Sequence, residues 1–253
     1  MKFAAVAAAA AVSLTACATS TPAEESTGVY DPFEGWNRGV FAFNETVDKA
    51  ALEPAARAYR AATPSLFREG VSNVLSNLRQ PVVFVNSVLQ GNANASGETF
   101  GRFLINSTVG VVGIFDVAST LGVKEHREDF GQTLGVWGVE EGPFLMLPVL
   151  GPSNARDLVG MGVDNAFQPL NYIEYEGDLS QTDVAVTRGV LSALTAREQL
   201  IETFETLREQ PEPYVAMRRT YTSQRKAAIR NGKSEEDPYK DLPDFDDFGD
   251  FDE

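Results

Sequence analysis

The side chains able to support nucleophilic or acid–base chemistry are few, since the 253 residues include one histidine and one cysteine. A Ser–His hydrolase would have to use His126, which lies in the charged segment 124–129, a pattern typical of a solvated turn. A carboxylate pair such as Glu125 with Asp129 is equally unspecific. The sequence contains no Gly-X-Ser-X-Gly elbow and no Gly-rich phosphate loop followed by Lys. We therefore expect no enzyme activity, no cofactor and no metal site.

Cys17 has a more specific chemistry. Residues 1–16 have the pattern of a secretory signal peptide, a cation followed by an apolar stretch too short to span about 30 Å of hydrocarbon. The segment Leu14-Thr-Ala-Cys17 resembles the bacterial lipobox, which predicts cleavage before Cys17 and acylation of its thiol and amine. Two or three acyl chains would hold the protein on a membrane. An ordinary signal peptide with an incidental Cys17 is the alternative. Because Ala18 and not Asp follows the cysteine, we expect the periplasmic side of the outer membrane.

Charge is distributed unevenly along the chain. The formal net charge is −15, and residues 235–253 contribute ten acids and one Lys to it. An acidic protein of this kind is a poor candidate for binding nucleic acid. We expect residues 233–253 to be a disordered, self-repelling tail. Cations concentrate near the end of the domain, where they predict a solvated helix face balanced by the acidic tail, or a contact with anionic headgroups or an acidic partner surface: Arg218, Arg219, Arg225, Lys226, Arg230 and Lys233.

The elements that would carry these residues are mostly helices. Residues 17–30 predict a flexible acylated tether, and residues 31–232 a single all-α domain opened by Asp31 as N-cap and Pro32. The apolar spacing predicts helices over about 33–47, 53–62, 64–78, 81–90, 93–108, 181–207 and 212–231. Two Gly-rich apolar segments, 109–115 and 134–152, predict tight reversals. After residue 17 no stretch reaches about 18 consecutive apolar residues, so we expect amphipathic helices that lie in a bilayer interface.

Four segments in register make the domain recognisable. The opening segment 31–44, DPFEGWNRGVFAFN, resembles the first motif of the MlaA (VacJ) family of outer-membrane phospholipid-transport lipoproteins. Segments 80–91, 102–118 and 129–157 agree with that family in order and spacing, and Glu212-Pro-Tyr214 resembles a weaker last motif. The resemblance covers residues 31–232 and leaves out the tether and the tail.

The resemblance implies a ring of helices lying in one leaflet, with a polar channel through the ring. It implies that the protein works beside a trimeric porin, removes misplaced phospholipid from the outer leaflet and passes it to a soluble periplasmic carrier, maintaining lipid asymmetry. The alternative is an envelope lipoprotein that binds porins as a scaffold and moves no lipid.

Candidate residues follow from these expectations. For the ring's outer, membrane-facing side we expect Trp36, Phe41, Val111, Phe115 and Trp137. Polar and gate candidates for the channel, or for the helix contacts that shape it, are Asn37, Arg38, Phe43, Asn44, Asn86 and Asn106. The resemblance implies that the first helix controls access, which would place Phe43 and Asn44 near a gate. For each asparagine the alternative is a buried packing or capping amide.

Overall fold

The computed structural model describes residues 29–173 and 180–231. The expected signal peptide, Cys17 and the acidic tail lie outside these described residues, as does all of the expected tether except Val29 and Tyr30.

Most of the described chain is helical, as expected, and one short hairpin accompanies the helices. The elements are α2 (Glu34–Val47), the π-helix η1 (Asp48–Leu52), α3 (Glu53–Ala62), α4 (Ser65–Leu89), α5 (Ala93–Thr108), α6 (Val117–Thr120), α7 (Phe130–Val136), β1 (Phe144–Leu147), β2 (Gly151–Asn154), α8 (Ala155–Ala166), the 3-10 helix η2 (Pro169–Tyr172), α9 (Gln181–Gln199), α10 (Ile201–Arg208) and α11 (Pro213–Ile229). Strands β1 and β2 are antiparallel, with Phe144 opposite Asn154.

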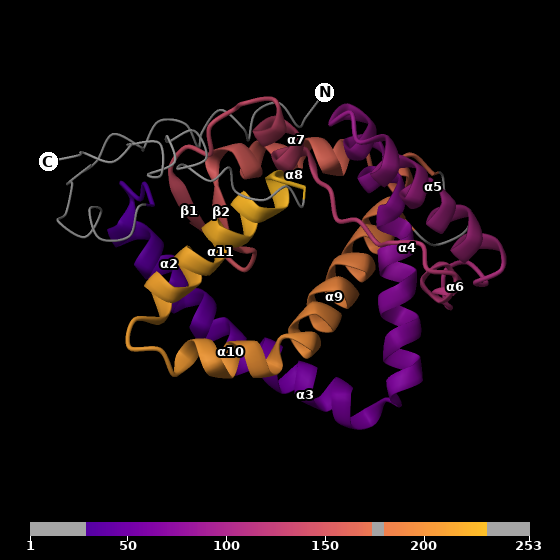
Figure 1. The fold of residues 1–253 in the computed structure, drawn as a ribbon. Helices are drawn as coiled ribbons and strands as arrows, with labels where there is room; N and C mark the ends of the chain where they lie inside the picture. The colour runs from indigo at the N-terminus through magenta and orange to yellow at the C-terminus, as the bar shows by residue number, and fades with distance from the viewer. Residues whose placement is uncertain (1–28, 174–179, 232–253) are drawn as a thin grey trace, which may run out of the picture.

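The helices form an open frame and not a parallel bundle (Figure 1). Helices α2, η1 and α3 follow one another along one edge, and α4 with α5 forms the next. Helix α7 packs on α8, α4 and α11, while the hairpin packs on α2, α8 and α11. Helix α9 crosses from α4 to α3 and continues into α10, which contacts α11. Because the hairpin packs on both α2 and α11, it connects the first described helix to the last.

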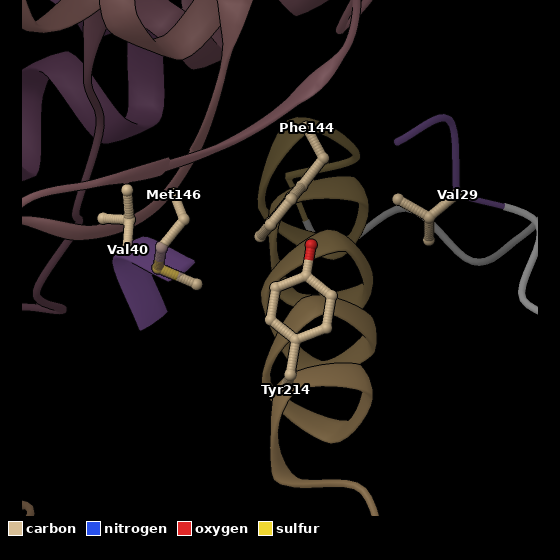
Figure 2. Close-up of a cluster of buried hydrophobic side chains, with 5 residues drawn as sticks. All are labelled: Val29, Val40, Phe144, Met146 and Tyr214. Atoms are coloured by element: carbon tan, nitrogen blue, oxygen red, sulfur yellow. The ribbon is translucent and has the colours of Figure 1, made fainter. Parts of the chain in front are cut away.

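The apolar core is small and lies where α2, β1 and α11 meet. Phe144 and Met146, alternate residues of β1, point into it together with Val29, Val40 and Tyr214 (Figure 2). The rings of Phe144 and Tyr214 meet edge to face, with centroids 6.2 Å apart. A core of this size orients three elements and leaves most of the frame to be held by other contacts.

Two predicted boundaries at the start of the domain are wrong. Val29, expected to belong to a flexible tether, is buried in the core. Helix α2 begins at Glu34, three residues after the expected N-cap Asp31. The reason is that the carboxylate of Asp31 is used in a tertiary contact with Arg218 and is therefore not free to cap the first turn.

The structure also differs from the prediction at two points of helix continuity, one break that was predicted and is absent and one that was not predicted and is present. Helices expected over 64–78 and 81–90 are one helix, α4, with Pro81 in its interior. Proline at that position removes one backbone donor, but packing along α5 and buried residues on both sides, such as Asn77 and Val83, keep the helix continuous. Conversely, the helix expected over 181–207 ends at Gln199 and restarts after Leu200, whose ψ of 13° is not helical.

Candidate membrane interface and the polar joints beneath it

Apolar and polar side chains are distributed in the reverse of the usual order. Among the described residues, twenty-nine large apolar side chains are exposed and only eleven apolar residues are buried, whereas twenty-three polar or charged residues are buried. Soluble domains place large aliphatic and aromatic residues inside and rarely bury charged ones. An exposed apolar surface of this extent marks a contact with lipid or with another protein.

The predicted membrane-facing residues are mostly at this surface. Trp36, Trp137, Val111 and Phe115 are 69%, 54%, 53% and 51% exposed, respectively. Phe41 is the exception, because its ring packs edge to face on Tyr214 with centroids 5.8 Å apart and supports the core.

The first Gly-rich segment is an apolar turn that we define as residues 109–115. Val111 and Val112 adopt φ of 52° and 58°, which β-branched residues rarely do, and Gly113 has φ of 90°. A backbone bond from the Gly113 N–H to the Asn106 carbonyl at 2.7 Å closes the turn. Its exposed side chains are Val109, Val111, Val112, Ile114 and Phe115. Such strain persists only where the surroundings enforce it, and it marks sites under functional constraint.

Within the described residues, no helix combines the length and the apolar character needed to cross a bilayer. The exposed apolar side chains are spread over many helices and the turn.

Beneath the apolar surface, arginine–carboxylate clusters connect the helices, and the first joins α2 to α11. Arg218 donates to Asp31 Oδ2 at 2.6 Å, and neither side chain reaches solvent. The Tyr214 hydroxyl donates to the same oxygen, and Asn37 Nδ2 donates to Oδ1 at 2.7 Å. Three donors on Asp31 provide the compensation that a buried carboxylate requires. We call these four residues the α2–α11 joint.

A second cluster joins the π-helix to α9 and α10. Arg197 donates Nε and Nη2 to the two oxygens of Asp48 at 2.7 and 2.9 Å. Arg208 donates to Asp48 Oδ2 and to Glu53 Oε2, each at 2.5 Å. Hydrogen bonds from Arg208 and then Arg57 lower the pKa of Glu53 to about 2. The bend between α2 and α3 is therefore fixed to α9 and α10 by charge.

A third cluster joins α7, α8 and α11. Arg225 donates to both oxygens of Asp129, at 2.6 and 2.9 Å, and to Asp157 Oδ1 at 2.9 Å. Burial alone would raise the pKa of Asp129, but Arg225 outweighs it and lowers that pKa to about 2. The expectation that the last helix presents its cations to solvent or headgroups is therefore wrong for Arg225, and likewise for Arg218.

Two of the predicted channel amides serve as further joints. Asn37 is fully buried, donates to the Phe144 carbonyl at 3.0 Å and accepts from the Met146 N–H at 2.9 Å, which fixes β1 to α2. Asn86 is also fully buried and donates to Asp164 Oδ1 at 2.8 Å, which connects α4 to α8. Both asparagines thus have the packing role that the sequence left open as the alternative.

Asn106 and Arg38 have partners of their own. Asn106 donates to Asp116 Oδ1 and accepts from the Ala118 N–H, both at 2.9 Å, and so fixes α6 to α5. Arg38 is partly exposed, donates to Glu34 at 2.7 Å and lies 4.7 Å from the centroid of the Tyr214 ring.

Asn44 lies beside the tip of the hairpin. Asn44 donates to the Leu147 carbonyl at 2.9 Å and accepts from the Val149 N–H at 2.7 Å. Val149 has φ of 67°, and its side chain is exposed. Phe43, one residue earlier on α2, is 51% exposed. A single amide therefore holds a strained, exposed turn of the hairpin against the first helix.

The three groups considered for hydrolysis have structural partners. Glu125 accepts from the Ser76 hydroxyl at 3.1 Å. His126 Nε2 lies 2.5 Å from Glu98 Oε2 on α5. Asp129 caps α7 by accepting from the Gln132 N–H and is ion-paired with Arg225, so it is ionised throughout the physiological range.

The arginine joints were missed by sequence reasoning. Their members lie up to 187 positions apart, as Asp31 and Arg218 do, so spacing along the chain gives no signal of the pairing. Asp31, Asp129 and Asp157 do fall inside the segments that resemble the family, and their position there was the signal in the sequence that these carboxylates have a role in the fold.

Comparisons with known proteins agree with this architecture. The sequence profile described as MlaA lipoprotein matches residues 29–228. The Escherichia coli K12 protein named intermembrane phospholipid transport system lipoprotein MlaA is 34% identical over 232 residues, which span 89% of this chain and 88% of that protein. An uncharacterised protein of Rickettsia typhi is 36% identical over 204 residues, 80% of this chain and 79% of its own. A solved structure, described as the structural basis for maintenance of bacterial outer membrane lipid asymmetry, matches with a TM-score of 0.70 and 32% identity over 79% of this chain and 98% of that one. This chain belongs to the MlaA lipoprotein family.

Proposed function

We propose that the protein is anchored through Cys17 on the periplasmic side of the outer membrane and removes misplaced phospholipid from the outer leaflet, maintaining lipid asymmetry. A porin trimer beside it and a soluble periplasmic carrier are its proposed partners. The observation that carries the proposal is the exposed apolar surface of twenty-nine side chains, which water would penalise and acyl chains would solvate. The name of the Escherichia coli relative, an intermembrane phospholipid transport lipoprotein, supports the same assignment.

The physical task is to move a charged headgroup past hydrocarbon. Nothing in the bilayer core solvates such a group, so unassisted passage costs many kcal/mol. A ring with an apolar outside and a polar opening removes that cost for the headgroup while the tails stay in lipid. The arrangement of helices in Figure 1, held by ion pairs that are buried at Asp48 and Asp31 and partly buried at Asp129, supports a ring of this kind. Without a nucleotide-binding motif, the protein lets lipid move only down a gradient.

Access to the opening is proposed to depend on Phe43 and Asn44. The two hydrogen bonds between Asn44 and the hairpin tip, one donated and one accepted, support this role, because their loss would free a strained turn next to the first helix.

Anchoring is tested at Cys17 and Ala18. Cys17→Ser removes the acylation site, and Ala18→Asp introduces the residue that retains lipoproteins in the inner membrane, whereas Ala18→Ser is the matched control. We expect the first two variants to enrich phospholipid in the outer leaflet, measured by outer-leaflet labelling in cells, and the control to behave as wild type. An unchanged lipid distribution in the Cys17→Ser strain would contradict the proposal.

A porin-binding scaffold that moves no lipid is the second candidate, favoured by the finding that Asn37, Asn44, Asn86 and Asn106 all make structural hydrogen bonds. Asn44→Leu separates the two functions, with exposed Thr46→Leu on the same helix as control. A conduit gated at the hairpin predicts altered outer-leaflet phospholipid with unchanged porin association for Asn44→Leu. A scaffold predicts no change in lipid while the fold is intact, as checked by circular dichroism.

A further inference from the structure

Between α6 and α7 the chain crosses α5 and α4 as an extended segment, residues 121–128, which we call the strap. Backbone hydrogen bonds hold its first three residues, 121–123, to α6. Side-chain contacts position the rest: Arg102 donates to the Val123 carbonyl at 2.6 Å, Ser76 to Glu125 at 3.1 Å, Gln90 to Glu128 at 3.0 Å and Gln132 to the Arg127 carbonyl at 2.7 Å, and His126 lies 2.5 Å from Glu98. The partners of the strap therefore lie on α4 with its C-cap Gln90, on α5 and on α7.

The cations of the strap and of the adjoining α4 differ from most others in the protein. In the part of the chain that the structure describes, only Arg79, Lys124 and Arg188 form neither a hydrogen bond nor an ion pair, although Arg79 interacts with Asp164 through its charge. Arg79 and Lys124 are exposed, and Arg79 lies one helical turn beyond Ser76, where α4 contacts the strap. Arg127, also on the strap, is 84% exposed and has a single ion pair, at 3.5 Å.

Exposed apolar groups border these cations. The apolar turn 109–115 is held against α4 by Asn73, which donates to the Ile114 carbonyl at 3.1 Å, one turn before Ser76. Leu121, the first residue of the strap, is 66% exposed. Exposed cations beside exposed apolar side chains form the pattern of a protein surface that rests at the interface of an anionic bilayer.

We propose that Arg79, Lys124 and Arg127 form a contact surface for anionic phospholipid headgroups. This inference rests on the proposed function in that the apolar turn lies among acyl chains, and it adds the chemistry of the neighbouring headgroups. A chain of net charge −15 is repelled by an anionic membrane as a whole, so local attraction requires exposed cations that the protein's own carboxylates hold only weakly. Among the described residues Lys124 has no ion pair, Arg127 has one at 3.5 Å, and Arg79 has only a charge interaction with Asp164. Each such cation near an anionic surface strengthens binding about fivefold.

The test uses the full mature chain carrying Cys17→Ser, so that acyl chains do not dominate binding, and vesicles of phosphatidylcholine with or without phosphatidylglycerol. Flotation is compared for the parent chain, for Lys124→Gln with Arg127→Gln, and for a control pair of equal charge change, Lys49→Gln with Lys226→Gln. Both control lysines are exposed, at 60% and 52%, and lie on η1 and α11.

We expect the parent chain to prefer the anionic vesicles, and the strap pair to weaken that binding about 25-fold while binding to phosphatidylcholine is unchanged. Adding Arg79→Gln should weaken it about fivefold more, and high salt should remove the preference.

Equal losses for the strap pair and the control pair would overturn the inference but leave the proposed function intact, since neutral vesicles would still bind. A preference that emerges only after deletion of residues 235–253 would show that the strap binds the acidic end of its own chain, and the lipid assignment would fall. Failure of the parent chain to bind either vesicle would contradict the membrane placement itself.

Discussion

At the scale of single residues, charge does the work that apolar contacts do in a soluble protein. When large apolar side chains face outward, they contribute little to holding helices to one another, because they bury little area against neighbouring helices. Arg197, Arg208, Arg218 and Arg225 instead connect helices through bidentate or multiple hydrogen bonds to carboxylates. Such pairs add geometric specificity, since a fork of donors fits its acceptor in few orientations.

The pKa of Asp129 gives a testable consequence. Its folded value of about 2 lies below its ordinary 3.8, so its ionised form stabilises the fold above about pH 4, and the contribution is lost as the pH falls toward 2. Asp129→Asn keeps an acceptor for capping α7 but loses the charge. We expect the variant to be less stable by about 2 kcal/mol at neutral pH and the difference to shrink below pH 4. Urea unfolding of both proteins across pH measures it; a difference that is constant with pH would contradict the assigned ion pair.

Residue roles were only partly predictable from the sequence. The exposed positions of Trp36 and Trp137 agree with the expectation for outward-facing aromatics, because bulky apolar residues on an amphipathic pattern are readily recognised. The asparagines could not be resolved, since a lumen amide and a packing amide have the same sequence signature. Asn86 became interpretable only when Asp164, 78 residues away, was found beside it.

At the scale of elements, close backbone contacts replace side-chain packing at one crossing. Helices α7 and α8 meet where Gly160 lies against the backbone of Gly131, such that a Cβ on Gly160 would come 2.7 Å from the Gly131 Cα. Gly162, two residues along the same helix, has open space around it. The glycines of α8 therefore have different roles despite similar sequence surroundings.

Alanine substitutions distinguish the two glycines. Gly160→Ala should destabilise the fold by about 1–3 kcal/mol, because neither backbone can move without disturbing the Arg225 cluster at the same crossing. Gly162→Ala should stabilise it by about 0.5–1 kcal/mol, as alanine lowers the entropy cost of forming a helix. Chemical unfolding measures both, and equal effects would show that the crossing is not tightly packed.

Elements were predicted well where periodicity is long and poorly where glycine dominates. The spacing in 93–108 predicted α5 with the bounds observed. Helix α7 ends inside the segment 134–152, where only reversals were expected, the hairpin lies mostly within that segment, and α8 follows it. Short elements such as β1 depend on contacts with α2 and α11, which local sequence does not encode. Pro81 predicted a break that tertiary packing on α5 overrides.

At the scale of the whole molecule, contacts between the first and last described elements join the two ends of the helical frame, which we call closure of the frame. The α2–α11 joint brings Asp31, near the beginning of the described chain, into contact with Arg218, near its end, at 2.6 Å. The small apolar core lies between the same two elements, α2 and α11, so the charge pair and the core together hold the ends of the frame. Removing either partner of the pair leaves the other charge uncompensated in a site without solvent.

A double-mutant cycle tests closure. Asp31→Asn and Arg218→Met should each destabilise the protein by about 3–5 kcal/mol, and the combined variant should lose much less than the sum, because no buried charge remains unpaired. Glu141→Gln with Lys226→Met, at a pair 3.8 Å apart with Lys226 half exposed, is the control and should show a coupling below about 1 kcal/mol. Urea unfolding gives the free energies for both cycles.

Hydrogen exchange decides whether the joint closes the frame or only adds stability. If it closes the frame, exchange in the Arg218→Met variant should accelerate in α2, the hairpin and α11 together, while α4 and α5, which pack along each other, keep their protection. The reason is that loss of the joint would free one side of the frame without disturbing the opposite side. Uniform acceleration over all helices would instead mean that the molecule unfolds as one unit, and the joint would then be one stabilising contact among several.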